Sequence, residues 1–496
     1  MRQLLRPGAG PGPTADPGRW RALAVTQVAG FMSLLDVSIV NVALPSIQRG
    51  VDASPGAAQW VVSGYALTFG LALVPAGRLG DALGRRPMFL IALAAFVATS
   101  AVSGAAPTAG TLVAARLLQG AAGGMMAPQV SGLIQNLFRG AERGRAFGIL
   151  GATIGLSTAA GPVVGGLILS VADGPDGWRW VFYVNLPIGL VALALAPRSV
   201  PDTGRDRAGL HLDLVGVALL GGGVLGVLLP LVQADAGGGG ELAWLLGPAV
   251  ALLATFAWWE RRVADRGRPP LVDPRLARVP GYVTGAGIGL VYFFGYTGIW
   301  LVFARYFQDG LGYSPLRSGL AVTPFALGVA ASAVVAGRMV ARVGRRLTVA
   351  GLAAVVGGLA VAALVLRHVE GDGAAWAAAG PLLVGGLGGG MVTSPNITLT
   401  LEAVPVRMAG VAGGALQTGQ RVGSALGTAG LSGLFSTVLD RTGGDYAVAI
   451  SDTLVGAAGV MVVALGLAVA ELVRRRSAET RGRPARTEPG HQLHQL

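Results

Sequence analysis

The ten residues Gly77–Arg86 read GRLGDALGRR, and a related string, GRMVARVGRR, returns 260 positions later as Gly337–Arg346. The outer glycines and the paired arginines match in the two copies. Each copy is a short polar gap between two long apolar stretches. A repeated gap of this kind predicts two halves related by internal symmetry, an organisation that membrane transporters commonly have.

The stretches around both copies belong to a series of fourteen apolar segments that runs through the chain. The composition agrees, with 52% hydrophobic and 13% charged residues and a mean hydropathy of +0.61. About 20 apolar residues cross ~30 Å of hydrocarbon, and their backbone must be helical because lipid offers no hydrogen-bond partner. We therefore predict an all-α membrane protein with fourteen spans.

The predicted spans are good to a few residues at each end. The first eight are Leu23–Pro45, Gln59–Gly77, Pro87–Ala106, Thr108–Phe138, Ala146–Leu169, Trp180–Ala196, Leu212–Val232 and Leu242–Trp259. The last six are Gly281–Phe307, Ser318–Ala336, Leu347–Leu366, Ala374–Leu399, Ala409–Leu439 and Leu454–Val473.

Arginine sets the expected orientation. All 38 basic residues are arginine, and most lie in the two termini and in every second gap. Positive residues concentrate on the cytoplasmic side of membrane proteins. We therefore expect a multi-pass protein of the inner (plasma) membrane with both termini in the cytoplasm. The net charge of +13 then reflects topology and contact with anionic lipid headgroups, not nucleic-acid binding.

The repeat also fixes the domain plan. The second span corresponds to the tenth, a shift of eight, whereas two six-helix halves would give six. Two extra helices must therefore lie between the halves. The plan is a cytoplasmic N-terminal segment (1–21), a six-helix bundle (22–200), two inserted helices (208–262), a second six-helix bundle (280–473) and a disordered cytoplasmic tail (474–496).

Five motifs, in this order and on these spans, resemble the major facilitator superfamily, and within it the fourteen-helix drug:proton antiporter family. They are Leu35–Pro45, Gly77–Arg86, Arg116–Gly120, Gly161–Gly166 and Trp178–Pro187. The resemblance implies two bundles that alternate access across the membrane, and export of drug-like molecules driven by the proton gradient, with no cofactor. Two departures are Ser38, where the family often has threonine, and Ala341, which replaces the aspartate of the second Gly-Arg motif.

Asp36 and Arg116 are the leading candidates for chemistry. An ionisable residue at mid-membrane costs ~2.5–3.5 kcal/mol on insertion scales and is functional by default. With 1.5 Å rise per residue, the two residues should lie within about one helical turn in depth, so we expect them to pair. Burial disfavours a charged carboxylate and a nearby arginine favours it. The resemblance gives both residues a part in proton coupling; the alternative is a static structural ion pair.

The fifth span carries small residues at steps of three and four, from Gly148 to Gly165, with Pro162 among them. Small stripes let helices approach closely, and proline bends a helix. We read Gly155, Gly161, Pro162, Gly165 and Gly166 as an antiporter signature and as a sealed contact between the halves. Ordinary tight packing is the alternative.

The first Gly-Arg gap is too short for a domain. Asp81 can cap a helix or pair with Arg85 or the other half. We expect Gly77, Asp81, Gly84, Arg85 and Arg86 to form a cytoplasmic latch that stabilises an outward-facing state.

Polar and aromatic residues within the spans are candidates for the substrate cavity, although for each one lipid-facing or packing roles are comparably frequent. They are Asn41, Trp60, Tyr65, Gln119, Tyr292, Phe293, Asn396, Gln417, Gln420 and Arg421. For Arg421 three roles are open: substrate binding, a lock between the halves, and packing against helix carbonyls. The remaining carboxylates near spans, at Asp213, Glu260, Glu402 and Glu471, fall at span ends near water. The cavity is thus neutral to slightly positive, so neutral, monocationic or weakly anionic compounds should be preferred over dications.

Other functional classes fit less well. The chain has no cysteine, which excludes disulfides and cysteine metal sites. No nucleophile–base pair or phosphate-binding loop occurs, so we expect no enzyme, no metal and no ATP. The alternatives are an exporter of one endogenous metabolite and a non-transporting membrane receptor or scaffold. The expected partners are a drug-like small molecule, protons and the bilayer, and we expect a monomer.

Overall fold

A computed structural model describes residues 18–172, 174, 176–202, 213–235, 242–369 and 371–481. All regular secondary structure in this part of the chain is helical. The first half contains α1 (Arg19–Gly50), α2 (Pro55–Leu83), α3 (Arg85–Ala105), α4 (Ala109–Leu137), α5 (Gly140–Val171), η1 (Gly177–Arg179), α6 (Trp180–Tyr183) and α7 (Asn185–Ser199). Two central helices follow, α8 (Leu214–Asp235) and α9 (Leu246–Asp265), with the short turns η2 (Ala243–Leu245) and η3 (Pro274–Arg278).

The second half contains α10 (Tyr282–Arg305), η4 (Tyr306–Gly310), α11 (Pro315–Val343), α12 (Arg345–His368), η5 (Gly371–Gly373), α13 (Ala374–Thr400), η6 (Val406–Met408), α14 (Ala409–Arg441) and α15 (Tyr446–Arg481). Each predicted span coincides with one of these helices or, for the sixth span, with η1, α6 and α7 in succession. The last helix continues to Arg481, eight residues beyond the predicted end at Val473. The rest of the expected tail and most of the N-terminal segment lie outside the described residues.

Within the described residues, twelve helical stretches are long and apolar enough to cross a membrane, or thirteen if the bent α5 forms one span. The helix missing from this count is α4, which has 29 residues, as many as α2. It is less apolar because Arg116, Gln119, Gln129 and Gln135 lie along it, and all four are buried inside the protein. Polar side chains that face other helices lower the hydropathy of a span without exposing charge to lipid.

The internal repeat extends over whole helices. Ser54 caps α2 by accepting a hydrogen bond from the Ala57 backbone N–H, and Pro55 occupies the first helical position. Ser314 and Pro315 do the same for α11, again 260 residues later. Serine before a proline is a favoured helix start. The far ends also match, because Gly84 (φ +102°) and Gly344 (φ +61°) separate α2 from α3 and α11 from α12. A positive φ is cheap only for glycine.

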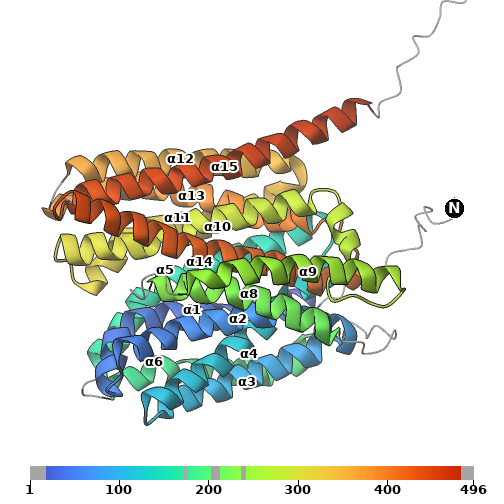
Figure 1. Ribbon diagram of the computed structural model, residues 1–496, viewed down its shortest axis with the longest axis horizontal. Coiled ribbons are helices and arrows are strands. Elements are labelled where there is room, and N and C mark those ends of the chain that lie inside the picture. Colours follow the sequence, from blue (N-terminus) through green and yellow to red (C-terminus); the bar gives the residue numbers. More distant parts are fainter. Residues whose placement is uncertain are drawn as a thin grey trace, which may run out of the picture.

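The helices form two bundles that lie side by side (Figure 1). In the first bundle α2 packs on α4, α1 on α5 and α7, and α3 on α4. In the second, α11 and α12 pack on α13, and α10 packs on α14 and α15. The bundles meet mainly through two helix pairs, α5 with α11 and α2 with α14, with smaller contacts of α5 with α13 and of α4 with α14. The central helices α8 and α9 pack on one another, and α8 also contacts α2 and α14 beside the second pair.

The apolar core of the first bundle continues into the second bundle at one end of the molecule. Its cluster includes Ile397 and Leu401 from the end of α13, and Ala412 and Leu416 from the start of α14. Leu276, in the segment after α9, belongs to the same cluster. The two bundles are therefore joined by continuous apolar packing at the end where α2 finishes and α14 begins.

Candidate functional site

Asp36, near the middle of α1, lies at the centre of a closed polar network. It is fully buried, and one carboxylate oxygen accepts a hydrogen bond from Arg116 at 2.5 Å. The other accepts from Gln119 at 3.1 Å and from Asn185 at 2.7 Å. A buried carboxylate is stable only when it is paired and hydrogen-bonded, and here three donors from α4 and α7 meet that condition. The ion pair expected from residue depth is thus present.

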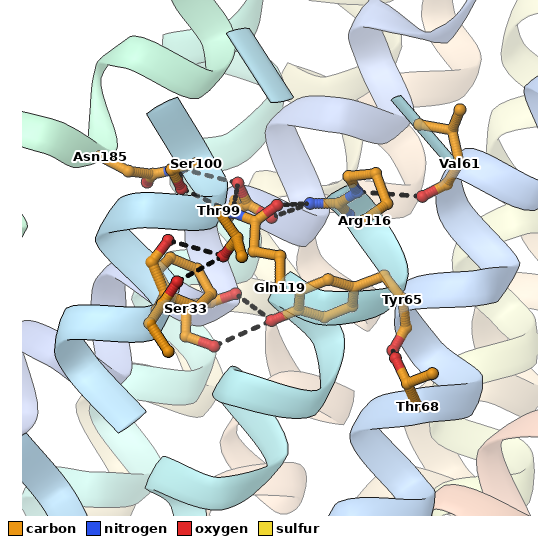
Figure 2. Close-up of polar contacts among 12 residues, drawn as sticks. Ser33, Val61, Tyr65, Thr68, Thr99, Ser100, Arg116, Gln119 and Asn185 are labelled. Carbon is orange, nitrogen blue, oxygen red and sulfur yellow. Dashed lines mark hydrogen bonds and ion pairs between the residues drawn. The ribbon is translucent and has the colours of Figure 1, made fainter. Parts of the chain in front are cut away.

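Arg116 is equally well enclosed. Its Nε donates to the Val61 backbone carbonyl at 3.0 Å, and its Nη1 also donates to Gln119 at 2.7 Å. The guanidinium lies 4.3 Å from the centre of the Tyr65 ring, and the Tyr65 hydroxyl is 3.0 Å from Ser33 Oγ. Figure 2 shows these side chains converging between the helices of the first bundle. Charge on Asp36 is therefore linked to α2, α4 and α7 at once.

Sequence reasoning missed two members of this network. Ser100 on α3 accepts from Gln119 at 2.6 Å, and Asn185 at the start of α7 donates to both Asp36 and Ser100. Asn185 is buried and begins an apolar run. A polar residue at the start of such a run is a signal in the sequence that could have identified it. Gln119 was expected in the substrate cavity, but the structure places it beside Asp36.

The latch residues meet at the joined end of the bundles. Asp81 accepts hydrogen bonds from the backbone N–H groups of Gly410 (3.2 Å) and Val411 (3.1 Å), the first turn of α14. A carboxylate is favoured there by both the free N–H groups and the helix dipole. Arg85 pairs with the same carboxylate at 2.5 Å and reaches the Val406 carbonyl at 3.5 Å. Asp81 therefore connects the two bundles.

The glycines of this motif permit the contact. A Cβ at Gly77 would lie within 2.8 Å of the Gly410 backbone carbon, so α2 and α14 touch backbone to backbone. Gly84 provides the positive-φ turn into α3. Arg86 donates to the Pro197 carbonyl at the end of α7, within its own bundle.

Further polar contacts cross between the bundles at the same end. Gln135 donates to the Ala409 carbonyl at 3.3 Å, and Arg143 donates to the Glu402 carbonyl at 3.3 Å. Gln417 donates to Ser131 Oγ at 3.1 Å. Together with Asp81 and the shared apolar core, they close this end of the molecule.

The second copy of the motif works differently. Ala341 stands where an aspartate would be, and Arg345 pairs instead with Glu471 of α15 at 2.8 Å. Arg345 also donates to Asn396 Oδ1 at 2.6 Å. These partners all belong to the second bundle, so this copy holds one bundle together and does not join the two. Asn396, expected in the cavity, lies in this internal contact.

Two carboxylates assigned to water-exposed span ends are in fact buried. Glu471 is 5% exposed because it is held by Arg345 and Arg475. Glu260 is 2% exposed and accepts from the Val272 backbone N–H at 2.9 Å. The prediction failed because position along a helix gives depth but not which neighbours cover the side chain.

Helix α5 bends by 41° between Thr158 and Val163. Pro162 has no backbone N–H, so the carbonyl of Thr158, four residues earlier, loses its helical partner. Ser38 Oγ on α1 donates to that carbonyl at 3.2 Å. The serine that departs from the family pattern thus satisfies the group that the proline frees.

The small residues of α5 pack against two neighbouring helices, α11 and α1. Gly155 faces Ala330 and Val329 of α11, across the bundle boundary. Gly161 faces Ser38, and Gly165 faces Ile39, both on α1. Gly166 has open space where a Cβ would point. The predicted contact between the halves therefore involves the first part of the stripe, whereas the proline segment packs within its own bundle.

The remaining cavity candidates do not form one cluster. Asn41 is exposed on α1, and Trp60 packs in a small apolar cluster with Val224 and Leu228 of α8. Tyr292 is buried in the core of the second bundle, with Phe293 packed beside it. Their rings meet edge to face at 5.5 Å.

Three candidates share α14. Gln420 is almost fully buried against Gly289 of α10, and Gln417 reaches α4 as described. Arg421 points to α2, where its guanidinium lies 4.3 Å from the centre of the Phe69 ring. Phe69 lies one helical turn after Tyr65 on α2, so Arg421 contacts the ring next to the one that Arg116 contacts.

Comparison with known proteins identifies the family. The sequence profile of the Major Facilitator Superfamily matches residues 28–428. The chain belongs to this superfamily.

The relatives of this major facilitator transporter include proteins named for antibiotic export or resistance. It is 35% identical over 476 residues to the probable actinorhodin transporter of Streptomyces coelicolor, covering 94% of this chain and 82% of the relative. It is 36% identical over 466 residues to the puromycin resistance protein pur8 of Streptomyces alboniger, with 92% and 90% covered. The tetracenomycin C resistance and export protein of Streptomyces glaucescens is 33% identical over 420 residues, with 84% and 76% covered.

Solved structures confirm the predicted fold class. The human organic anion transporter MFSD10 superimposes with a TM-score of 0.66 at 15% identity, covering 91% of this chain and all of that one. The proton:xylose symporter XylE gives 0.61 at 16% identity, with 89% and 94% covered. The chain is thus a multi-pass major facilitator transporter, a class that does not consist of enzymes.

Proposed function

We propose that this transporter is a proton-coupled exporter of hydrophobic or amphipathic small molecules, of the fourteen-helix drug:proton antiporter type. The observation that carries the proposal is Asp36, a fully buried carboxylate at mid-membrane whose one cationic partner among the described residues is Arg116. Burying such a group costs several kcal/mol. Its network gives a reason for that cost, because the carboxylate joins helices whose packing has to change during transport.

Proton uptake at Asp36 would weaken this network in a defined way. A neutral carboxyl no longer attracts Arg116 as an ion, and one oxygen becomes a donor where Gln119 and Asn185 already donate. Arg116 keeps the Val61 carbonyl, so it can turn toward α2. Protonation therefore favours a looser arrangement of α1, α4 and α7, and deprotonation the closed one. This is the two-state element that coupling requires.

The latch accounts for the second step of the transport cycle, the opening and closing of one end. Asp81 and the other cross-bundle contacts hold one end closed, and the arginine distribution assigns that end to the cytoplasm. The arrangement then corresponds to an outward-facing state. Breaking Asp81 from the start of α14 would allow the cytoplasmic end to open, as alternating access requires. The energy source is the proton gradient, and no cofactor is needed.

Export is supported by the signature in α5 and by the relatives named for antibiotic export or resistance. A fourteen-span topology with cytoplasmic termini in the plasma membrane follows if α4 and the bent α5 each cross the bilayer once. We expect the chain to function as a monomer in direct contact with lipid. Substrates would bind near mid-membrane between the bundles.

The test is Asp36→Asn in proteoliposomes that contain a pH-sensitive dye. The amide keeps the size of the side chain and removes the titratable group. With a panel of amphipathic drugs, the wild-type protein should move protons when a substrate is added. Asp36→Asn should insert and bind but show no substrate-dependent proton movement. Asp372→Asn, an exposed aspartate on an ion pair with Arg317, is the matched control and should behave as wild type. Normal proton movement in Asp36→Asn would refute the proposal.

A further inference from the structure

Arg421 is a mid-membrane arginine for which the described part of the chain provides no counter-ion. Among the described residues it forms no ion pair and no side-chain hydrogen bond; its close partner is the ring of Phe69 at 4.3 Å. The other mid-membrane arginine, Arg116, has Asp36, a backbone carbonyl and Gln119. Arg116 and Arg421 therefore differ in their partners, although both lie near the middle of the membrane.

The magnitudes show that Phe69 does not compensate this charge. A cation–π contact offsets only part of the free energy that an arginine at the centre of a membrane costs. Arg421 is half-buried, and its guanidinium faces α2 across the boundary between the bundles. It lies twelve residues after Ala409, roughly 18 Å along α14, which is too deep for a lipid headgroup.

The face of α14 that carries Arg421 has glycines at the latch and long side chains further along the helix. Gly410 and Gly414 touch the backbone of α2 at Gly77 and Leu73. The next residues on this face, at steps of three and four, are Gln417 and Arg421, whose long side chains need more room than glycine. Arg421 therefore lies on the face of α14 that meets α2, beyond the backbone-to-backbone contacts of the latch.

The surroundings of Arg421 are aromatic and carry positive charge in excess. Tyr65 and Phe69 lie on one face of α2 with ring centres 6.0 Å apart; Arg116 covers Tyr65 and Arg421 covers Phe69, each at 4.3 Å. Near these rings there are thus two guanidinium groups and one carboxylate, Asp36, which is already bound to Arg116.

We propose that Arg421 binds the anionic group of the substrate, and that the substrate is a hydrophobic compound that carries a carboxylate or a similar anionic group. The anion would pair with Arg421, whose guanidinium lies over the buried Phe69 ring. This inference rests on the proposed function and narrows the substrate class that net charge alone left open. A guanidinium is suited to the task because it presents several N–H donors in one plane to two oxygens.

Three fluorescent probes with one ring system test it: pyrenebutyrate, its neutral methyl ester and pyrenebutylamine. Binding is measured by fluorescence titration on the purified full-length chain in nanodiscs. The wild type should bind the carboxylate at least about tenfold more tightly than the ester, which corresponds to about 1.4 kcal/mol, and the amine most weakly. Arg421→Gln should lower affinity for the carboxylate to that for the ester and leave ester binding unchanged. Arg421→Lys should retain part of the preference. Arg317→Gln, at an exposed arginine, is the matched control.

If a variant fails to fold, the order of the wild-type affinities for the three probes tests the inference by itself. Tighter binding of the ester or the amine, or no binding of any probe, overturns it. A carboxylate preference that persists in Arg421→Gln also overturns it, because the anion then binds elsewhere. Proton movement in proteoliposomes separates this result from the proposed function. Ester-driven proton movement that survives in Arg421→Gln supports coupling through Asp36 whatever the outcome for Arg421.

Discussion

The substitution Asp81→Asn should shift the balance between the two access states. The carboxylate accepts from Gly410 and Val411 across the bundle boundary, whereas its bond to Arg85 lies within the first bundle. Only the hydrogen bonds to Gly410 and Val411 require this end of the molecule to be closed. An amide keeps one acceptor oxygen and presents an NH2 group to the other backbone N–H. One charge-assisted bond is therefore lost, which is worth about 1.5–3 kcal/mol, or roughly a ten- to hundred-fold change in the ratio of closed to open protein.

The chain has no cysteine, so this shift can be measured with two introduced labels. Ala141 and Ala403 are exposed on opposite bundles, next to Arg143 and Glu402, which are in contact. Spin labels at Ala141→Cys and Ala403→Cys should give a short distance in the wild type. Adding Asp81→Asn should move much of the population to longer distances and slow transport, with substrate affinity changed by only a few-fold.

The control for this experiment is Asp372→Asn in the same doubly labelled protein. Its carboxylate is 85% exposed in a surface ion pair, and such pairs contribute little, so its distances should match wild type. An unchanged distance distribution in Asp81→Asn would refute the latch. A complete loss of substrate binding would instead make Asp81 part of the binding site.

Three further perturbations test other parts of the structure. Gly77→Ala places a Cβ against the Gly410 backbone; overpacking of about 1–3 kcal/mol should open the same end in the label assay, while Gly419→Ala, with open space at its Cβ, should not. Ser38→Ala leaves the Thr158 carbonyl without its donor and should destabilise by about 1–3 kcal/mol, seen as a lower unfolding temperature; Ser170→Ala, which loses only an exposed contact within its own helix, should not, and equal unfolding temperatures would disprove this account of the kink. A chain that joins Arg205 directly to Arg268 should still insert with a cytoplasmic C-terminus, because two spans are removed; a C-terminal reporter found outside would contradict the span count.

The sequence alone located the helices and one ion pair. Apolar length predicts each helix because the bilayer thickness fixes how many residues a span needs. The 260-residue repeat predicts the two bundles, and it extends to the serine–proline starts of α2 and α11. Equal depth was enough to pair Asp36 with Arg116, since each faces the interior of the same bundle. In the second copy of the motif Ala341 replaces the aspartate, and Arg345 pairs with Glu471 inside its own bundle.

Tertiary structure decided which neighbour each side chain meets. Asn185 and Ser100 complete the Asp36 network, Asp81 binds the start of α14, and Glu471 pairs with Arg345. None of these partners is near in sequence. Distance along a helix axis gives depth, whereas direction around the axis and the choice of neighbouring helix depend on how the whole bundle packs. For the same reason, only the folded chain distinguishes Arg116, which has a counter-ion, from Arg421, which has none among the residues that the structure describes.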